Sequence, residues 1–178
     1  LSLVTALVSC VAYFKATQSN DRTWERYADW SYYGHVLSLF GVLTVLFLII
    51  NNHYFEYHYA WNYSSKYLPI YYQISSFWNG QEGSFLLWMF WNAMLGLVLI
   101  KTNKFWKPSV MAVMTFTQFC LTTLILGVVI FELKIGSSPF LLLRDVVQDA
   151  IFVVNPEFIP EDGNGLNPLL QNYWMVIH

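Results

Sequence analysis

Charged residues are scarce in this sequence. Lysine, arginine, aspartate and glutamate make up 11% of its 178 residues, whereas hydrophobic residues make up 56% and aromatic residues 19%. A soluble domain has roughly a quarter charged residues, so the composition excludes an ordinary soluble enzyme and favours an integral membrane protein. The net charge of −2 also gives no basic footprint of the kind that binds nucleic acid. We therefore expect the lipid bilayer, and no nucleic acid, as a partner.

Cysteine is equally rare. Cys10 and Cys120 both lie in apolar runs, far apart in the sequence. Neither belongs to a CxxC pair, so their spacing indicates no disulfide, zinc site or redox-active thiol pair. We expect both to be small, buried apolar residues.

The apolar runs predict an all-α integral membrane protein with about four transmembrane helices and the start of a fifth. A helix needs about 20 apolar residues to cross the hydrocarbon core. The four helices are expected at about 1–15, 33–51, 84–100 and 109–131. The chain starts and stops within or near apolar runs, so residues 1–178 are expected to be one membrane segment of a longer polypeptide.

The last of these runs contains a polar stripe. Thr115, Gln118 and Thr122 are spaced i, i+3 and i+7, which places them on one face of a helix. Polar side chains in a membrane face neighbouring helices or a cavity. We expect this face to pack inward.

Basic residues predict the orientation in the membrane. They gather in two short connections, as Lys15, Arg22, Arg26, Lys101, Lys104 and Lys107. The long segments 52–83 and 132–178 contain few basic residues. The positive-inside rule therefore places both short connections in the cytoplasm and both long segments outside.

The two outer segments hold the unusual sequence patterns. Residues 53–63, HYFEYHYAWNY, alternate aromatic and polar side chains, which is typical of a strand or of a segment at the membrane surface. Residues 139–154 predict an interfacial amphipathic helix. A turn-rich loop, NPEFIPEDGNGLNP, follows, and it leads into an apolar stretch that predicts a further span.

The histidines are the first candidates for cofactor chemistry. We expect a structural role for His35, near the cytoplasmic start of the second run. His53 and His58 are five residues apart, whereas metal-binding histidines on one helix face are three or four apart, so a solvated or interfacial pair is expected. His178 follows an outer loop, with Trp174 four residues earlier. This position makes it a candidate cofactor ligand.

The stretch WNGQEGSFLLW, residues 78–88, contains the second candidate site. Ser84 is a plausible N-cap, and Glu82 lies where the positive end of the helix dipole favours a carboxylate. Glu82 is therefore expected to orient the helix rather than to act in catalysis. There are more tryptophans here than one interfacial belt needs, namely Trp78, Trp88 and Trp91. They either have a packing role or form the floor of a binding site for a flat ligand.

Several motifs resemble those of one family. WNGQEGSFLLW resembles the WGxHEGSLLLW-type motif of CcmF, the haem-handling subunit of the bacterial cytochrome c haem lyase. SSKYLPIYYQIS (64–75) resembles the stretch that precedes this motif in the family, and SSPF (137–140) is similar to its NPF element. GNGLNPLLQNYWMVIH (163–178) is similar to the family's GxxLNPLLQ…HPP segment. The resemblance covers most of the chain from about residue 33 onward.

The resemblance implies a function for the longer protein. CcmF-type proteins of the bacterial inner membrane receive haem from the periplasmic chaperone CcmE and help to attach it to the CxxCH cysteines of apocytochrome c, together with other maturation subunits. By this resemblance His178 is an axial ligand of the haem iron, and Trp78, Glu82 and Trp88 shape the haem-binding face. No residue is expected to be catalytic, and this segment alone is not expected to be an enzyme.

The sequence also departs from the family. The tryptophan-rich WWD segment, the second periplasmic histidine and the two membrane histidines that ligate a resident haem b are missing. Gln81 occupies the position of the family's histidine before EGS, which argues against an obligatory metal ligand there. The alternatives are a CcsA-like single-component synthase and a structural or transport subunit without haem. Transport by ion coupling is disfavoured, because the three later spans have no charged residues in their interiors.

Overall fold

The chain folds into two compact units. The computed structural model describes residues 1–19, 21–131, 133–172 and 174. The first unit is made of residues 1–43 and 85–137, and the second is made of residues 44–84 and 138–178.

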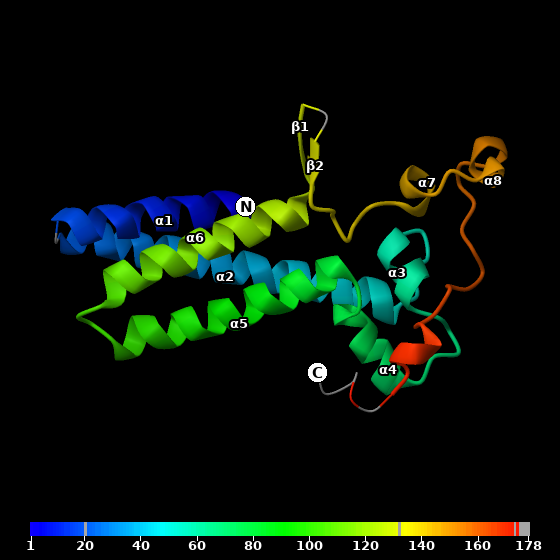
Figure 1. The fold of residues 1–178 in the computed structure, drawn as a ribbon, viewed down its shortest axis with the longest axis horizontal. Coiled ribbons are helices and arrows are strands. Elements are labelled where there is room, and N and C mark those ends of the chain that lie inside the picture. Colours follow the sequence, from blue (N-terminus) through cyan, green and yellow to red (C-terminus); the bar gives the residue numbers. More distant parts are fainter. Residues whose placement is uncertain (20, 132, 173, 175–178) are drawn as a thin grey trace. The chain divides into compact units, whose positions relative to one another are not determined.

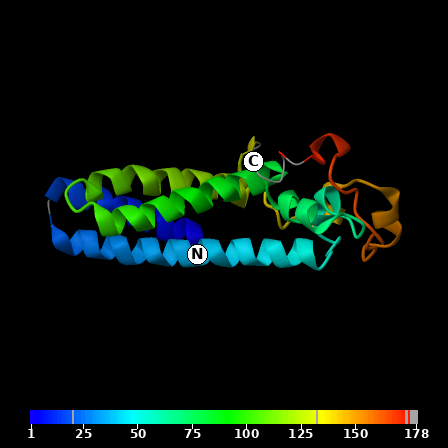
Figure 2. The ribbon, with the colours of Figure 1, turned by 90° about the horizontal axis from the view of Figure 1, so that it is seen from below.

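Long helices build the first unit. They are α1 (Ser2–Ser19), α2 (Arg22–Asn51), α5 (Gln81–Thr102) and α6 (Lys107–Leu126), of which α2 and α5 continue into the second unit. Within the first unit these helices run side by side (Figures 1 and 2). The α1–α2 and α5–α6 connections lie at the same end of this bundle, so the bundle brings together the two basic segments that the sequence assigns to one side of the membrane.

Among the described residues, three helices are long and apolar enough to cross a membrane, namely α2, α5 and α6. The chain is therefore a mostly helical, multi-pass membrane protein. The helix predicted near the N-terminus exists as α1, but its polar side chains, such as Thr5, Ser9 and Lys15, reduce its hydropathy. That α1 crosses the membrane stays a prediction.

Two helix ends differ from the predicted boundaries. α2 begins at Arg22, well before the predicted start at 33, because the Asp21 carboxylate accepts a hydrogen bond from the Thr23 N–H at 2.8 Å and caps the helix. α6 ends at Leu126 rather than at 131. Gly127 follows with a φ of 68°, the left-handed conformation that ends many helices.

A hairpin replaces the predicted last turn of α6. Strands β1 (Val128–Ile130) and β2 (Leu133–Ile135) pair in antiparallel register, with Val129 opposite Lys134. β-branched side chains favour an extended backbone over a helix, and the run after Gly127 is rich in them. The sequence prediction overlooked this competition because the run is also apolar.

The predicted polar stripe of α6 is confirmed as an inward-facing surface. Thr115 and Gln118 are fully buried and Thr122 is 8% exposed. The Gln118 amide donates a hydrogen bond to the Met89 carbonyl of α5 at 2.8 Å, and this bond ties the two helices together. His35 is also fully buried in the bundle, and its Nδ1 lies 3.0 Å from the Ser2 hydroxyl of α1.

Small residues of α1 allow it to pack closely on α6. Ala6, Ala12 and Ala16 are buried in this helix, and small side chains let helix backbones approach each other in membranes. Both cysteines are free thiols. Cys10 lies near this contact, with its sulfur 3.7 Å from the Ala112 carbonyl oxygen. Cys10 is only partly buried and Cys120 is exposed on α6, so the prediction that both are buried was wrong.

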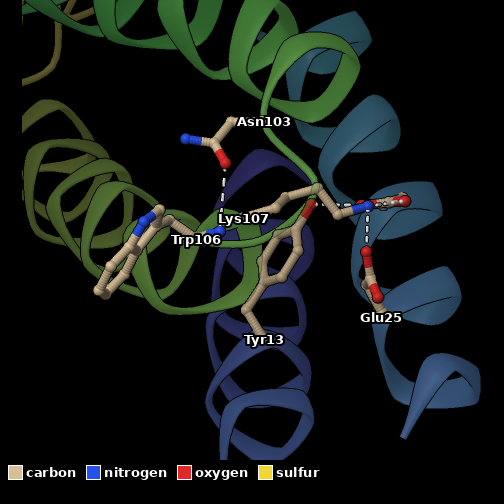
Figure 3. A network of polar contacts seen from close by, with 6 residues as sticks. Tyr13, Glu25, Asn103, Trp106 and Lys107 are labelled. Atoms are coloured by element: carbon tan, nitrogen blue, oxygen red, sulfur yellow. Dashed lines mark hydrogen bonds and ion pairs between the residues drawn. The ribbon is translucent and has the colours of Figure 1, made fainter. Parts of the chain in front are cut away.

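A charged cluster joins three helices at the end of the bundle where the connections lie (Figure 3). The Lys107 ammonium group at the start of α6 contacts Glu25 at 2.5 Å and Asp29 at 2.9 Å, both on α2. The Tyr13 hydroxyl of α1 donates to the other oxygen of Asp29 at 2.6 Å. The Lys107 side chain is only 9% exposed. Lys107 therefore connects helices within the bundle, in addition to contributing positive charge at its end.

Short helices build the second unit. They are α3 (His58–Tyr63), α4 (Ile70–Ser75), the 3-10 helix η1 (Ser76–Trp78), α7 (Leu143–Val146), α8 (Ala150–Val154) and the 3-10 helix η2 (Pro168–Leu170). Most of the 53–63 stretch forms α3 rather than a strand. The predicted amphipathic helix at 139–154 is instead the pair α7 and α8. The backbone is extended at Val147, which ends α7, and at Asp149, which caps α8. Residues 173 and 175–178, on which the predicted fifth span depends, lie outside the described residues.

Candidate functional site around helix α3

The EGS-containing motif attaches to α3 through Tyr59. The Tyr59 hydroxyl donates to the Phe77 carbonyl at 2.9 Å, and it accepts from the Gly80 N–H at 3.2 Å. Tyr59 is 2% exposed. A Cβ atom on Gly83 would overlap both the Phe77 carbonyl and the Tyr59 hydroxyl. A glycine at position 83 is therefore needed for the start of α5 to lie this close to α3.

The segment after SSPF pairs with the residues that lead into α3. The Leu143 N–H donates to the Glu56 carbonyl at 2.8 Å, and the His58 N–H donates to the Leu141 carbonyl at 2.9 Å. Tyr57 and Leu142 form an antiparallel bridge between these two bonds. Backbone pairing thus fixes the residues after SSPF beside the N-terminus of α3.

The GNGLNP loop attaches to the other end of α3. The Asn164 N–H donates to the Trp61 carbonyl at 2.7 Å, and the Gly165 N–H donates to the Ser64 carbonyl at 3.0 Å. The EGS-containing motif, the residues directly after SSPF and the GNGLNP loop are distant in the sequence, yet each contacts α3 or a residue directly beside it. We call α3 and these attached stretches the α3 hub.

Ionisable groups of the α3 hub lie around Glu82. Burial lowers the pKa of His58, and the negative charge of Glu82 opposes this shift. Burial raises the pKa of Tyr59, and Glu82 raises it further. His58 is therefore a neutral imidazole at neutral pH, and Tyr59 keeps its hydroxyl proton as a hydrogen-bond donor. The site therefore combines the uncharged side chains of His58 and Tyr59 with the carboxylate of Glu82.

The structure separates the residues that the sequence singled out. Glu82 lies in the first turn of α5, as predicted, and Trp78 ends η1. The prediction of Ser84 as the N-cap was wrong: α5 begins at Gln81, and the Ser84 hydroxyl donates to the Trp78 carbonyl at 2.9 Å. Trp78 and Glu82 thus both belong to the unit that contains the α3 hub.

Two predicted site residues lie elsewhere. Trp88 belongs to the first unit, is 59% exposed and packs edge-on against Phe85. The assignment of Trp88 to the same haem-facing surface as Trp78 and Glu82 stays a prediction. His178 lies outside the described residues, so its role also stays a prediction.

Sequence reasoning missed α3, Tyr59 and Asp162. α3 is only six residues long, too short to show a helical period. The alternating aromatic and polar residues there predict a strand or a segment at the membrane surface instead. The Asp-Gly pair at 162–163 indicates only a turn. In the described part of the chain, no group of three or more histidine, cysteine, aspartate or glutamate residues could hold a metal ion.

The fold and the site together define a multi-pass helical membrane protein in which stretches distant in the sequence converge on one short helix. Comparison with known proteins gives the family. The chain is 32% identical over 181 residues to the cytochrome c-type biogenesis protein CcmF of Pseudomonas fluorescens, covering all of this chain and 24% of that protein. For CcmF of Pseudomonas aeruginosa the identity is also 32%, over all of this chain and 25% of that protein.

A third relative, the cytochrome c-type biogenesis protein CycK of Rhizobium meliloti, is 27% identical over 143 residues, which cover 78% of this chain and 18% of that protein. No family model and no solved structure matches the chain. The chain belongs to the CcmF family, and it corresponds to about the N-terminal quarter of its members. The resemblance predicted from the motifs is thereby confirmed.

Proposed function

We propose that this chain serves cytochrome c-type biogenesis as the membrane part of a haem lyase. In this role it receives haem from a CcmE-like periplasmic chaperone and helps to attach it to the CxxCH cysteines of apocytochrome c, with other maturation subunits. The observation that carries the proposal is the similarity to CcmF along the entire chain. The chain spans about a quarter of the length of these relatives, so the activity belongs to the longer protein.

We place haem binding in the longer protein at the α3 hub. The segment that starts at Gly163 leads to His178, which we assign as an axial ligand of the haem iron because imidazole suits iron. When bound, haem would supply the reactive vinyl groups. The chain would orient the haem and hold its iron, with Trp78, Glu82 and Trp88 shaping the face it meets. The neutral imidazole of His58 and the protonated Tyr59 are compatible with an apolar ligand at this site.

We place the protein in the bacterial inner membrane, with the α3 hub in the periplasm. In a cysteine-free background, Tyr67→Cys and Lys104→Cys should label differently in intact cells. Tyr67 is 90% exposed in the second unit and Lys104 is exposed between α5 and α6. An impermeant thiol reagent should modify only the cysteine at 67. Labelling only at 104 would mean that the orientation is reversed.

His178 is tested by removing its imidazole. The full-length protein, co-expressed with its haem chaperone, should lose most of its haem as His178→Gly and regain it when imidazole is added. The reason is that free imidazole can occupy the vacated ligand position. A pyridine haemochrome spectrum measures the haem content of the purified protein.

His53→Gly is a matched control for this experiment. His53 has a φ of 55°, a left-handed conformation that glycine adopts without strain, so the same change there should leave the haem content unaltered. If His178→Gly keeps all its haem and still supports cytochrome c assembly, His178 is not an axial ligand. A membrane subunit with a purely structural role would then be favoured.

A further inference from the structure

One carboxylate, Asp162, holds the loop at 162–166 against the chain that follows α3. Its Oδ1 accepts hydrogen bonds from the Lys66 N–H at 2.9 Å and the Gly163 N–H at 2.8 Å. Its Oδ2 accepts from the Ser65 hydroxyl at 2.9 Å. Burial alone would raise the pKa of Asp162, but these three donors and the charge of Lys66 lower it. Asp162 is therefore charged at neutral pH and satisfies three donors at once.

The close approach of the loop to α3 reinforces this latch, by which we mean Asp162 together with its three donors. A Cβ atom on Gly163 would overlap the carbonyl oxygen of Ser64 and approach that of Trp61. The hydrogen bonds to the carbonyls of Trp61 and Ser64 described above need this closeness. The loop is thus fixed by side-chain and backbone contacts with Trp61 of α3 and with the residues directly after this helix.

Local contacts continue from the latch toward the C-terminal segment. Leu166 is 2% exposed. The Asn167 side chain accepts from the Leu169 N–H at 3.0 Å and starts η2, and the Gln171 amide donates to the Leu166 carbonyl at 2.8 Å. The chain is therefore held from Asp162 to Gln171, and it continues in sequence to His178.

We propose that Asp162 is a positioning residue for haem capture, because it fixes the origin of the segment that carries His178. The inference rests on the proposed role of His178 as an axial ligand. Without the latch, the segment would start from a loop that no longer keeps its place on α3. The imidazole of His178 would then reach the haem iron in only a fraction of the molecules.

The test compares three variants of the full-length protein, co-expressed with the haem chaperone. Asp162→Ala removes the acceptor of all three bonds. Asp162→Asn keeps one oxygen that can accept from the backbone N–H groups of Lys66 and Gly163. Its amide NH₂ group can donate to the Ser65 hydroxyl, because a hydroxyl oxygen accepts as well as donates. Glu161→Ala removes the same kind of charge from the exposed neighbouring residue. Haem content is measured by pyridine haemochrome with and without imidazole, beside His178→Gly.

We expect Asp162→Ala to lower the haem content about tenfold, which corresponds to losing roughly one hydrogen bond to a charged group. Added imidazole should restore it, since free imidazole replaces a ligand that is out of place but does not refold a damaged protein. Asp162→Asn and Glu161→Ala should stay close to wild type.

Two results would overturn the inference. If His178→Gly loses haem and Asp162→Ala keeps it, the latch does not position the ligand, and the proposed function stands. If Asp162→Ala loses haem that imidazole does not restore, Asp162 does not act through the axial ligand. Unchanged haem in His178→Gly would instead remove the proposed ligand, and the inference would fall with it.

Discussion

Replacing Lys107 with methionine should destabilise the helix bundle, and this is one of the two largest effects expected for a single substitution in this protein. The change leaves Glu25 and Asp29 without their cation, in a cluster where their side chains are 27% and 21% exposed. Removing one partner costs about 3–5 kcal/mol in a fully buried ion pair and about 0–1 kcal/mol in an exposed one, so the loss here should lie between these limits. Thermal unfolding of the purified protein in detergent, followed by tryptophan fluorescence, should show a clearly lower Tm.

Lys104→Met is the control for this prediction. It removes the same charge from the same connection, but Lys104 is exposed, and exposed charges contribute about 0–1 kcal/mol. The triple variant Glu25→Gln, Asp29→Asn, Lys107→Met should recover part of the loss, since it leaves no unpaired charge. Equal Tm values for the Lys104 and Lys107 variants would show that the cluster does not stabilise the bundle.

Lys107 also shows the limits of prediction from the sequence. Its place in a lysine-rich connection predicted its side of the membrane, but could not reveal its partner Asp29, which is 78 residues away. A usable signal was present, because Glu25 and Asp29 are four residues apart and share one helix face. The long apolar runs predicted the helices of the bundle correctly. Their ends depended on local details at Asp21 and Gly127, which hydropathy does not report.

The α3 hub was less accessible to sequence reasoning than the bundle. The motifs predicted the family and marked the correct stretches, but not that these stretches meet on one short helix. Ser65 and Asp162 are 97 residues apart, and no periodicity connects them. Backbone pairing such as that between Tyr57 and Leu142 depends on register, which neither stretch specifies alone.

The second large effect is expected from Gly83→Ala, because it acts where the EGS motif meets α3. The new methyl group would overlap the Phe77 carbonyl and the Tyr59 hydroxyl. The Phe77 carbonyl is backbone and Tyr59 is 2% exposed, so neither can move away freely. Overpacking of this kind typically costs about 1–3 kcal/mol. We expect a lower Tm and increased proteolysis of the 52–83 segment, which the Tyr59 hydrogen bonds no longer hold.

Gly41→Ala is the matched control, since it makes the same change within α2 where a Cβ atom would meet nothing within 4 Å. Alanine is favoured over glycine in a helix by roughly 0.5–1 kcal/mol, so this variant should be unchanged or slightly more stable. The two substitutions are chemically identical and differ only in the space around them. If both raise the Tm, α5 does not approach α3 as closely as the contacts of Gly83 require. If only Gly83→Ala lowers it, the glycine of the EGS motif serves close packing, and Glu82 sits beside α3 because Gly83 lets α5 start there.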